Sequence, residues 1–305
     1  MSRRRKGRDI HGIVLLDKPA GWSSNQAVQK VRWLFQARKA GHTGSLDPFA
    51  TGMLPICLGE ASKTAGFMLD AAKTYIAEAR LGQATSTGDI EGEGVAEAAV
   101  PGPDCAPLRT ALARFEGRIR QIPPMYSALK HAGQPLYKLA RAGREVPRAA
   151  REVTVHELRL LRWEPPLLVF RVHCSKGTYV RTLAEDIGLE LSSRAHLTAL
   201  RRLAVEPFDE SDMVGLEQLE AMREAGTLES CLLPPDAGLQ AWPLVALCEA
   251  DAARFGHGNA VAGVAPTAGL VRVYGPAGLL LGLGEVTGER VLEARRVFNY
   301  ETLDS

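Results

Sequence analysis

Strand-like and helix-like patterns do not alternate regularly along this chain. Apolar runs at 11–18 and 73–85 predict strands, and residues 25–36 predict a helix because their apolar side chains recur at helical spacing. Two further strand patterns, 153–164 and 167–174, follow each other with no helix between them. A doubly wound parallel sheet requires regular alternation of strands and helices. The order therefore predicts an α+β fold.

The 305 residues fall into regions that differ in composition and in the pattern of apolar residues. Residues 1–9 carry five basic side chains and are expected to form a flexible tail, either as a solubilising end or as an arm that touches phosphates. Residues 10–235 hold the main succession of strands and helices, and the stretch 234–243 resembles a linker. Residues 243–303 offer one helix candidate and short apolar runs separated by Gly and Pro. That texture predicts a small β-rich domain with a closed, barrel-like form.

The bulk composition excludes several classes of protein. The five cysteines include no CxxC pair, and their odd number suggests neither a disulfide framework nor a zinc site. We therefore expect a reducing compartment, the cytoplasm. The apolar run after the basic N-terminus is too short for a signal peptide, and no segment is long enough to span a membrane. A net charge of +2 does not indicate whether the protein binds nucleic acid. That question depends on how the charges are distributed along the chain.

The segment 138–151 concentrates positive charge. Its cations are spaced by three or four residues, which would place them on one side of a helix, although Pro147 would interrupt that helix. A solvated charged face is one interpretation, and an arm that grips a phosphate backbone is the other. The turn-rich stretch 121–137 before it suits a projecting loop. The cations are Lys138, Arg141, Arg144, Arg148 and Arg151.

The stretch GHTGSLDP, residues 41–48, sets a lone carboxylate in a constrained turn. Pro48 restricts Asp47 to an extended backbone, and the two glycines permit tight turns. On these residues alone, an Asx turn anchored by Asp47 is a sufficient explanation. His42 with Asp47 could supply half of a metal site, but no further ligand spacing supports a metal.

The surroundings of Asp47 narrow its possible chemistry. Glycoside hydrolysis usually needs two carboxylates, and the next acid downstream is Glu60, beyond a predicted strand. A nucleophilic serine on a GxSxG turn is absent from the sequence. A single carboxylate can still act as a nucleophile or as a base if it is kept ionised and oriented.

Six stretches of the chain form a recognisable series: DKPAGWSS (17–24), GHTGSLDPFATGMLPICLGEASK (41–63), KTYIAEARLGQATSTGD (73–89), QIPPMYSALKHAGQPLYKLARAG (121–143), SKGTYVRTLAEDIG (175–188) and HLTALRRLAV (196–205). They resemble closely the TruB family of tRNA pseudouridine synthases. The resemblance covers roughly residues 10–235 in family order, and the C-terminal region is similar to a PUA-like domain with a weaker match. The family implies a mixed, largely antiparallel sheet of the pseudouridine synthase type.

The resemblance implies roles for the residues that match. Asp47 would be the catalytic aspartate, and Arg181, in the strand-end motif GTYVRT, would pair with it, keeping it ionised and oriented. Tyr75 would lie against the uracil face, close to the carbon that loses a proton. Tyr179 and Leu200 would line the pocket, and Tyr179 could also hold Arg181 or the target nucleotide.

Further residues would contact RNA. His42 would fill the space that the target base leaves in its stack, and Lys18, Lys63 and Asp89 would make lesser pocket or RNA contacts. In the family, the equivalent of the basic segment folds over the T loop, so we expect an arm over about 121–152 whose cations bind phosphates. The acidic stretch 89–104 should face away from RNA. The arm cations expected to bind are Lys138, Arg141 and Arg144.

The implied reaction isomerises the T-loop uridine at tRNA position 55 to pseudouridine, after the base has been everted from its stack. Nothing is oxidised or added, so we expect no cofactor and no metal. The family's stand-alone type implies tRNA as the partner, a monomer, and no obligate protein partner. Two alternatives stay open. One is a non-catalytic tRNA-binding or folding helper on the same scaffold, and the other is a hydrolase or glycosylase that would release free uracil.

Overall fold

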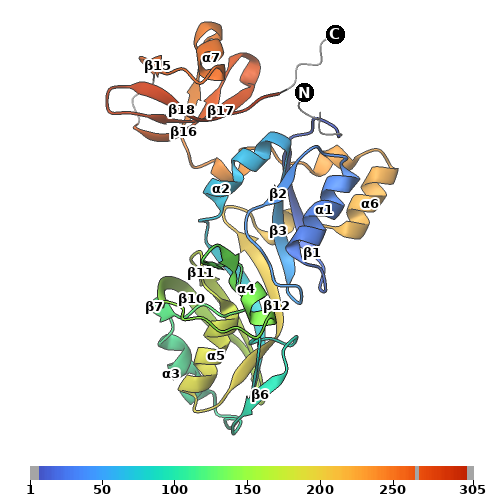
Figure 1. Cartoon of the computed structure of the whole chain (residues 1–305), viewed down its shortest axis with the longest axis vertical. Coiled ribbons are helices and arrows are strands. Elements are labelled where there is room, and N and C mark those ends of the chain that lie inside the picture. The colour runs from blue at the N-terminus through green and yellow to red at the C-terminus, as the bar shows by residue number, and fades with distance from the viewer. Residues whose placement is uncertain (1–6, 265–267, 301–305) are drawn as a thin grey trace.

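A computed structural model describes residues 7–264 and 268–300 of the chain. One large sheet runs through the middle and lower parts of an elongated molecule, and a small C-terminal domain lies at the upper end (Figure 1). In sheet order the strands are β13 (Val214–Gly215), β1 (Gly12–Lys18), β3 (Thr51–Leu58), β12 (Ala195–Val205), β4 (Lys73–Leu81), β11 (Leu167–Cys174), β10 (Arg151–Glu164) and β7 (Gly117–Gln121).

The pairing within this sheet confirms the predicted α+β class. Only β1 with β13 and β12 with β3 run parallel, and the other neighbours in the order are antiparallel. A short strand, β2 (Ala40–His42), adds to β3 and leads into the loop that carries Asp47. The sheet is therefore mixed and largely antiparallel, as expected.

Helices cover the sheet at both ends. The predicted helix at 25–36 is α1 (Ser24–Leu34), and Ser23 and Gln26 cap its first turn reciprocally. Its apolar side chains join the core that also contains strands β1 and β3. The other helices of the large domain are α2 (Ala65–Met68), α3 (Cys105–Ala113), α5 (Val180–Glu190) and α6 (Leu216–Glu224).

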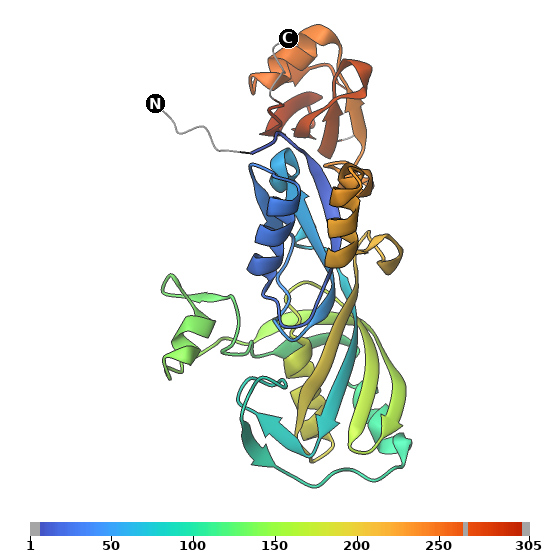
Figure 2. The ribbon, with the colours of Figure 1, turned by 90° about the vertical axis from the view of Figure 1, so that its right-hand side faces the viewer.

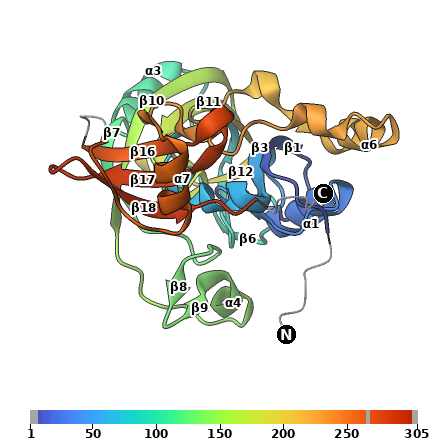
Figure 3. The same cartoon turned by 90° about the horizontal axis from the view of Figure 1, so that it is seen from above.

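A separate segment projects from the body (Figures 2 and 3). It leaves the sheet after β7, forms the short hairpin of β8 (Lys130–His131) and β9 (Gln134–Pro135), continues as α4 (Leu136–Arg141), and returns to β10. We call residues 122–150 the arm. A second small hairpin, β5 (Gln83–Thr85) with β6 (Gly94–Glu97), lies beyond the end of β4.

The C-terminal domain is a five-stranded sheet with one helix, α7 (Glu249–Gly256), as its β-rich texture predicted. A buried ion pair fixes its start, because Arg272 Nη1 lies 3.0 Å from Asp236 Oδ2 of the linker. Leu283 of this domain packs into a core cluster formed mainly by the large domain. The strands, in order, are β14 (Leu244–Ala246), β16 (Gly269–Tyr274), β17 (Leu280–Val286), β18 (Val291–Val297) and β15 (Val261–Ala262).

The predicted tail differs from the structure where it can be compared. Residues 1–6 lie outside the described residues. Arg8 is not part of a flexible tail: its backbone N–H donates to Gln36 O at 2.7 Å, and its side chain pairs with Glu229. Residues 265–267 and 301–303 of the predicted C-terminal domain also lie outside the description. None of the helices in the described part of the chain is long and apolar enough to cross a membrane.

Candidate active site

The loop after β2 holds Asp47 through contacts on both sides of it. Ser24, at the start of α1, donates to Leu46 O at 2.9 Å and accepts from Leu46 N–H at 2.8 Å. The carbonyl of Pro48 accepts from Gly21 N–H at 2.8 Å and from Lys18 Nζ at 3.2 Å. These bonds fix the backbone before and after Asp47, so the direction of its carboxylate is set by the fold.

Arg181 meets that carboxylate from the opposite side of the site. Its Nε lies 3.0 Å from Asp47 Oδ2, which is the predicted pairing. The backbone carbonyls of Thr87 and Tyr126 each accept from its terminal nitrogens at 2.7 Å. Arg181 is only 4% exposed, whereas Asp47 keeps 38% of its side chain open to solvent. The predicted position of Arg181 at the end of a strand is wrong, because the residue lies in the first turn of α5.

Asp89 is a second carboxylate on the same guanidinium, where we expected only a lesser contact. Its Oδ2 lies 3.4 Å from Arg181 Nη1, and its side chain is 4% exposed. Thr87 Oγ1 and Glu91 N–H donate to its other oxygen at 2.5 and 3.0 Å. Asp89 and Glu91, at the start of the acidic stretch 89–104, line the same groove as Asp47, so this end of the stretch lies at the site. That the stretch faces away from RNA stays a prediction.

The protonation of Asp47 reflects opposing influences. Burial raises the pKa of Asp47 above its ordinary value, and the negative charge of Asp89 adds to this shift. The Arg181 guanidinium and, more weakly, the Lys18 ammonium lower the pKa. Arg181 therefore favours the ionised carboxylate that nucleophilic or base chemistry needs.

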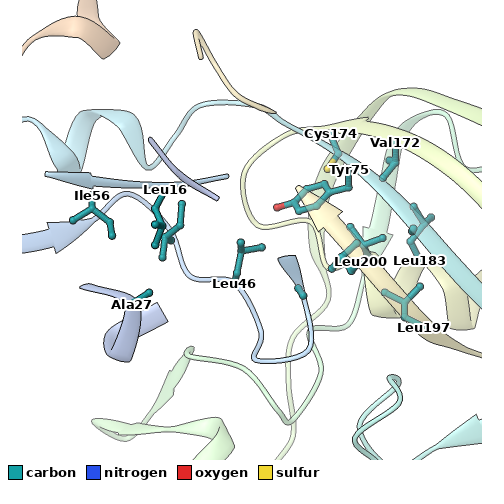
Figure 4. Close-up of a cluster of buried hydrophobic side chains, with 14 of the residues drawn as sticks. Leu16, Ala27, Leu46, Ile56, Tyr75, Val172, Cys174, Leu183, Leu197 and Leu200 are labelled. Atoms are coloured by element: carbon teal, nitrogen blue, oxygen red, sulfur yellow. The ribbon is translucent and has the colours of Figure 1, made fainter. Parts of the chain in front are cut away.

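A pocket of about 300 Å³ opens beside Asp47. Leu200 and Tyr75 lie on adjacent strands and form part of its wall, as predicted. Figure 4 shows Tyr75 beside Cys174, with its hydroxyl directed toward the side on which Leu46 lies. Burial raises the pKa of Tyr75, so the phenol stays protonated at neutral pH. An aromatic and an aliphatic wall next to an ion pair suit a planar, polar-edged ring.

Tyr179 lines this pocket too, but it does not hold Arg181 by a hydrogen bond. Its main-chain N–H donates to Gln121 Oε1 at 3.1 Å, and its carbonyl accepts from Gln121 Nε2 at 3.3 Å. Burial raises the pKa of the Tyr179 phenol. Its place at the N-terminal end of α5 lets it flank the pocket while Arg181, two residues later, reaches Asp47.

A second groove, of about 290 Å³, continues from Asp47 toward the arm. His42 lies on one side of it, and Tyr137 and Arg141 of the arm lie on the other. Gly44 N–H donates to His42 Nδ1 at 3.2 Å. Burial and the charge of Arg202 lower the pKa of His42, so the ring is neutral at pH 7. The groove joins the predicted base-replacing histidine to the arm.

The three arm cations predicted to bind phosphates do not all line the groove beside Asp47. Arg144 lines a neighbouring hollow with Glu185, whose pKa burial raises to about 7. Lys138 and Arg141 lie in α4, and all three predicted phosphate contacts are exposed. The helix ends at Arg141, before Pro147, and the chain from there to β10 has no regular structure.

Two predicted contact lysines have other positions. Lys18 is fully buried, and its Nζ donates to the carbonyls of Pro19 and Trp22 at 2.8 and 2.7 Å as well as to Pro48. It therefore supports the Asp47 loop from behind. Lys63 is not in the site: it pairs with Glu60 and donates to Val297 O of the C-terminal domain at 2.7 Å.

Two cations of the site were not predicted from the sequence. Arg202 and Lys73 both line the pocket, and both are almost completely buried. Burial lowers the pKa of Lys73 to about 8, and its Nζ donates to Leu69 O at 2.8 Å and Ala71 O at 2.5 Å. Arg202 falls inside the quoted stretch 196–205, but that stretch also carries His196, Thr198 and Arg201, so nothing local marked Arg202 as a site residue. Within the described residues, no cluster of side chains could hold a metal ion.

Comparison with known proteins agrees with this geometry. Family models match consecutive parts of the chain: the N-terminal domain of the TruB family pseudouridylate synthases at 32–180, the C-terminal domain of tRNA pseudouridylate synthase B at 181–240, and the C-terminal domain of pseudouridine synthase II TruB at 243–298.

Relatives match over nearly the full length. A tRNA pseudouridine synthase B of Pseudomonas paraeruginosa is 52% identical to this chain. The match covers 96% of this chain and 98% of the relative. One of Chromohalobacter salexigens is 48% identical over the whole of both chains. A solved chain from a Cbf5–Nop10–Gar1 complex superposes with a TM-score of 0.73 at 27% identity, covering 94% of this chain and 85% of that one. The chain therefore belongs to the TruB family of pseudouridine synthases.

Proposed function

We propose that this chain is an isomerase that converts a uridine of tRNA, at position 55 in the T loop, into pseudouridine. The observation that carries the proposal is the Asp47–Arg181 ion pair at the mouth of a pocket walled by Tyr75 and Leu200. The names of the relatives that match the full length support tRNA as the substrate. The reaction needs one oriented carboxylate and a place to hold a detached base.

The chemistry follows from what the site offers. The bond from the sugar C1′ to uracil N1 breaks, and its electron pair leaves with the base. Asp47 either attacks C1′ or removes a sugar proton, and Arg181 favours the ionised carboxylate in both routes. The detached uracil turns within the pocket, where Tyr75 and Leu200 prevent its escape. A bond from C1′ to C5 then forms. In the first route the Asp47–C1′ bond breaks as it does so, and in the second route Asp47 returns the proton to the sugar. The C5 proton is then lost as N1 gains one.

The RNA must present its base outside the helix for this to happen. Loops are suitable targets, because their bases can be splayed out and stacked on aromatic side chains at a cost of a few kcal/mol. The groove between His42 and Arg141 lies next to the base pocket, so it suits the nucleotides that flank the target. We infer that the arm closes over the T loop and that Lys138, Arg141 and Arg144 contact phosphates.

The remaining proposals concern the setting in which the enzyme acts. We infer a monomer that needs no protein partner, supported by a site assembled from one chain alone: Asp47, Tyr75 and Arg181 meet without a second subunit. All five cysteines are free thiols, which supports a reducing compartment such as the cytoplasm.

Tritium release tests the proposal. A tRNA transcript labelled at uracil C5 should lose tritium to water when C5 becomes bonded to the sugar. Free uracil in place of pseudouridine would indicate a hydrolase instead. Binding without any release, on several tRNAs, would indicate a helper protein. Asp70→Asn is a matched control, because Asp70 is an exposed carboxylate paired with Lys176 outside the pocket, and this variant should release tritium as the wild type does.

A further inference from the structure

Arg202 lies where three strands of the large sheet meet. It stands opposite Gly52 of β3 on one side and opposite Tyr75 of β4 on the other, and it is 2% exposed. Gly52 has φ +99°, and a Cβ there would lie 2.2 Å from the Arg202 carbonyl oxygen. Only glycine permits this approach, so the backbone of Arg202 is held against β3.

The guanidinium reaches into the loop that carries Asp47. Nη2 donates to Gly44 O at 3.1 Å, Nη1 donates to Ser45 O at 3.3 Å, and Nε donates to Met53 O at 2.6 Å. Gly44 and Ser45 precede Asp47 by three and two residues. One planar group therefore joins the start of the Asp47 loop to β3, with a rigid geometry that a lysine could not reproduce.

The charge of Arg202 has no direct counter-ion in the described part of the chain, where no carboxylate lies within ion-pair distance. Its three carbonyl partners are neutral. The guanidinium lines the same pocket as Tyr75, and its charge lowers the pKa of that phenol, opposing the effect of burial. A buried, uncompensated cation is costly for stability alone, which indicates a use in the site.

We propose that Arg202 is a positioning residue for the isomerisation, tying the Asp47 loop to strands β3 and β4 beside Tyr75 on the pocket wall. Its charge also favours the step in which the C1′–N1 bond breaks, because the electron pair of that bond passes to the uracil ring held in the pocket. The inference rests on the proposed function. It adds Arg202 as the residue that couples the Asp47 carboxylate to Tyr75 in the pocket wall.

Single-turnover tritium release and tRNA binding, measured separately, test this role. Arg202→Met should slow the chemical step by about 10²-fold, since misplacement of a reacting group by about 1 Å has that effect, while the tRNA Kd stays within about threefold. Arg202→Lys, which keeps the charge, should recover part of the rate. Arg201→Met is the matched control, because the neighbouring Arg201 pairs with Asp17 and lines a different hollow. Its rate should match the wild type.

A double-mutant cycle with Tyr75→Phe tests the coupling. If Arg202 acts partly through the Tyr75 hydroxyl, the double variant should lose less rate than the product of the single losses. Thermal melting of each variant gives its folded fraction, to which rates are normalised. An unchanged normalised rate for Arg202→Met, or losses that multiply fully with Tyr75→Phe, would overturn the inference. A wild type that releases no tritium would overturn the proposed function itself.

Discussion

The guanidinium of Arg181 lies 3.0 Å from the carboxylate of Asp47, and the two side chains differ sharply in exposure, at 4% and 38%. Two backbone carbonyls and Asp89 hold Arg181 in place, so the buried partner is fixed. The open edge of Asp47 faces the pocket. This arrangement leaves one side of the carboxylate accessible from the pocket while Arg181 sets its orientation.

The pH dependence of the reaction should report this pair. Either route needs the ionised carboxylate, so lowering the pH through the raised pKa of Asp47 should remove activity. Arg181→Met removes the cation that opposes the shift, so the pKa should rise further and the acid limb should move to higher pH. Arg181→Lys, which keeps the charge, should show a smaller displacement. Single-turnover rates against pH measure this, and acid limbs that coincide in all three proteins would contradict the electrostatic role of Arg181.

Lys18 should matter for stability more than for RNA contact. Its buried ammonium satisfies three backbone carbonyls around the Asp47 loop. Lys18→Met leaves them without that donor, at a cost of about 1–3 kcal/mol for a buried unsatisfied group. Urea unfolding of wild type and variant measures the loss. Lys39→Met, at an exposed site, is the control and should stay within about 0.5 kcal/mol. An unchanged midpoint for Lys18→Met would count against the supporting role.

The arm should bind through its charge. Replacing Lys138, Arg141 and Arg144 with Gln should flatten the plot of log affinity against log salt by about 0.7–0.9 for each phosphate that the variant no longer neutralises. Filter binding over a range of salt concentrations measures the slope. The matched control removes three exposed cations of β7 and β10, Arg118, Arg159 and Arg162, and should keep the wild-type slope. Equal slopes for wild type and arm variant would refute the phosphate contacts.

The arm should also become protected from protease when tRNA binds.

The C-terminal domain should depend on one buried pair for its docking. Arg272→Met would leave Asp236, which is 1% exposed, with the Tyr274 hydroxyl at 2.6 Å but without its cation. Breaking such a pair costs about 3–5 kcal/mol. We predict faster proteolysis of the linker at 234–243 in this variant. Arg295→Met, which removes an exposed pair with Glu285, should leave the linker as resistant as in the wild type. Equal cleavage of both variants would show that the pair does not hold the junction.

Local patterns were sufficient to predict much of this molecule. The apolar periodicity at 25–36 and the irregular order of strands and helices led to the correct fold class, because apolar periodicity is a local signal. The pairing of Asp47 with Arg181 was also predicted, through resemblance to a family, and the ion pair is present.

The rest depended on contacts distant in sequence. Arg202 became visible as a site residue only when the register placed it opposite both Gly52 and Tyr75. Asp89 joined the ion pair because a turn near the end of β4 brings it back to α5, across 92 residues of chain. Lys63 lies away from the pocket because its partner, Val297 O, is 234 residues distant in another domain. Single-sequence patterns carry no information about such pairings.

The most direct test of the account compares wild type and Asp47→Asn in release of tritium from tRNA labelled at uracil C5, with filter binding of the same tRNA by both proteins. The account predicts release by the wild type only, with similar Kd values, because the amide keeps the shape of Asp47 but neither attacks C1′ nor removes a sugar proton. Release by Asp47→Asn at the wild-type rate would contradict it and would reduce the Asp47 turn to a structural element.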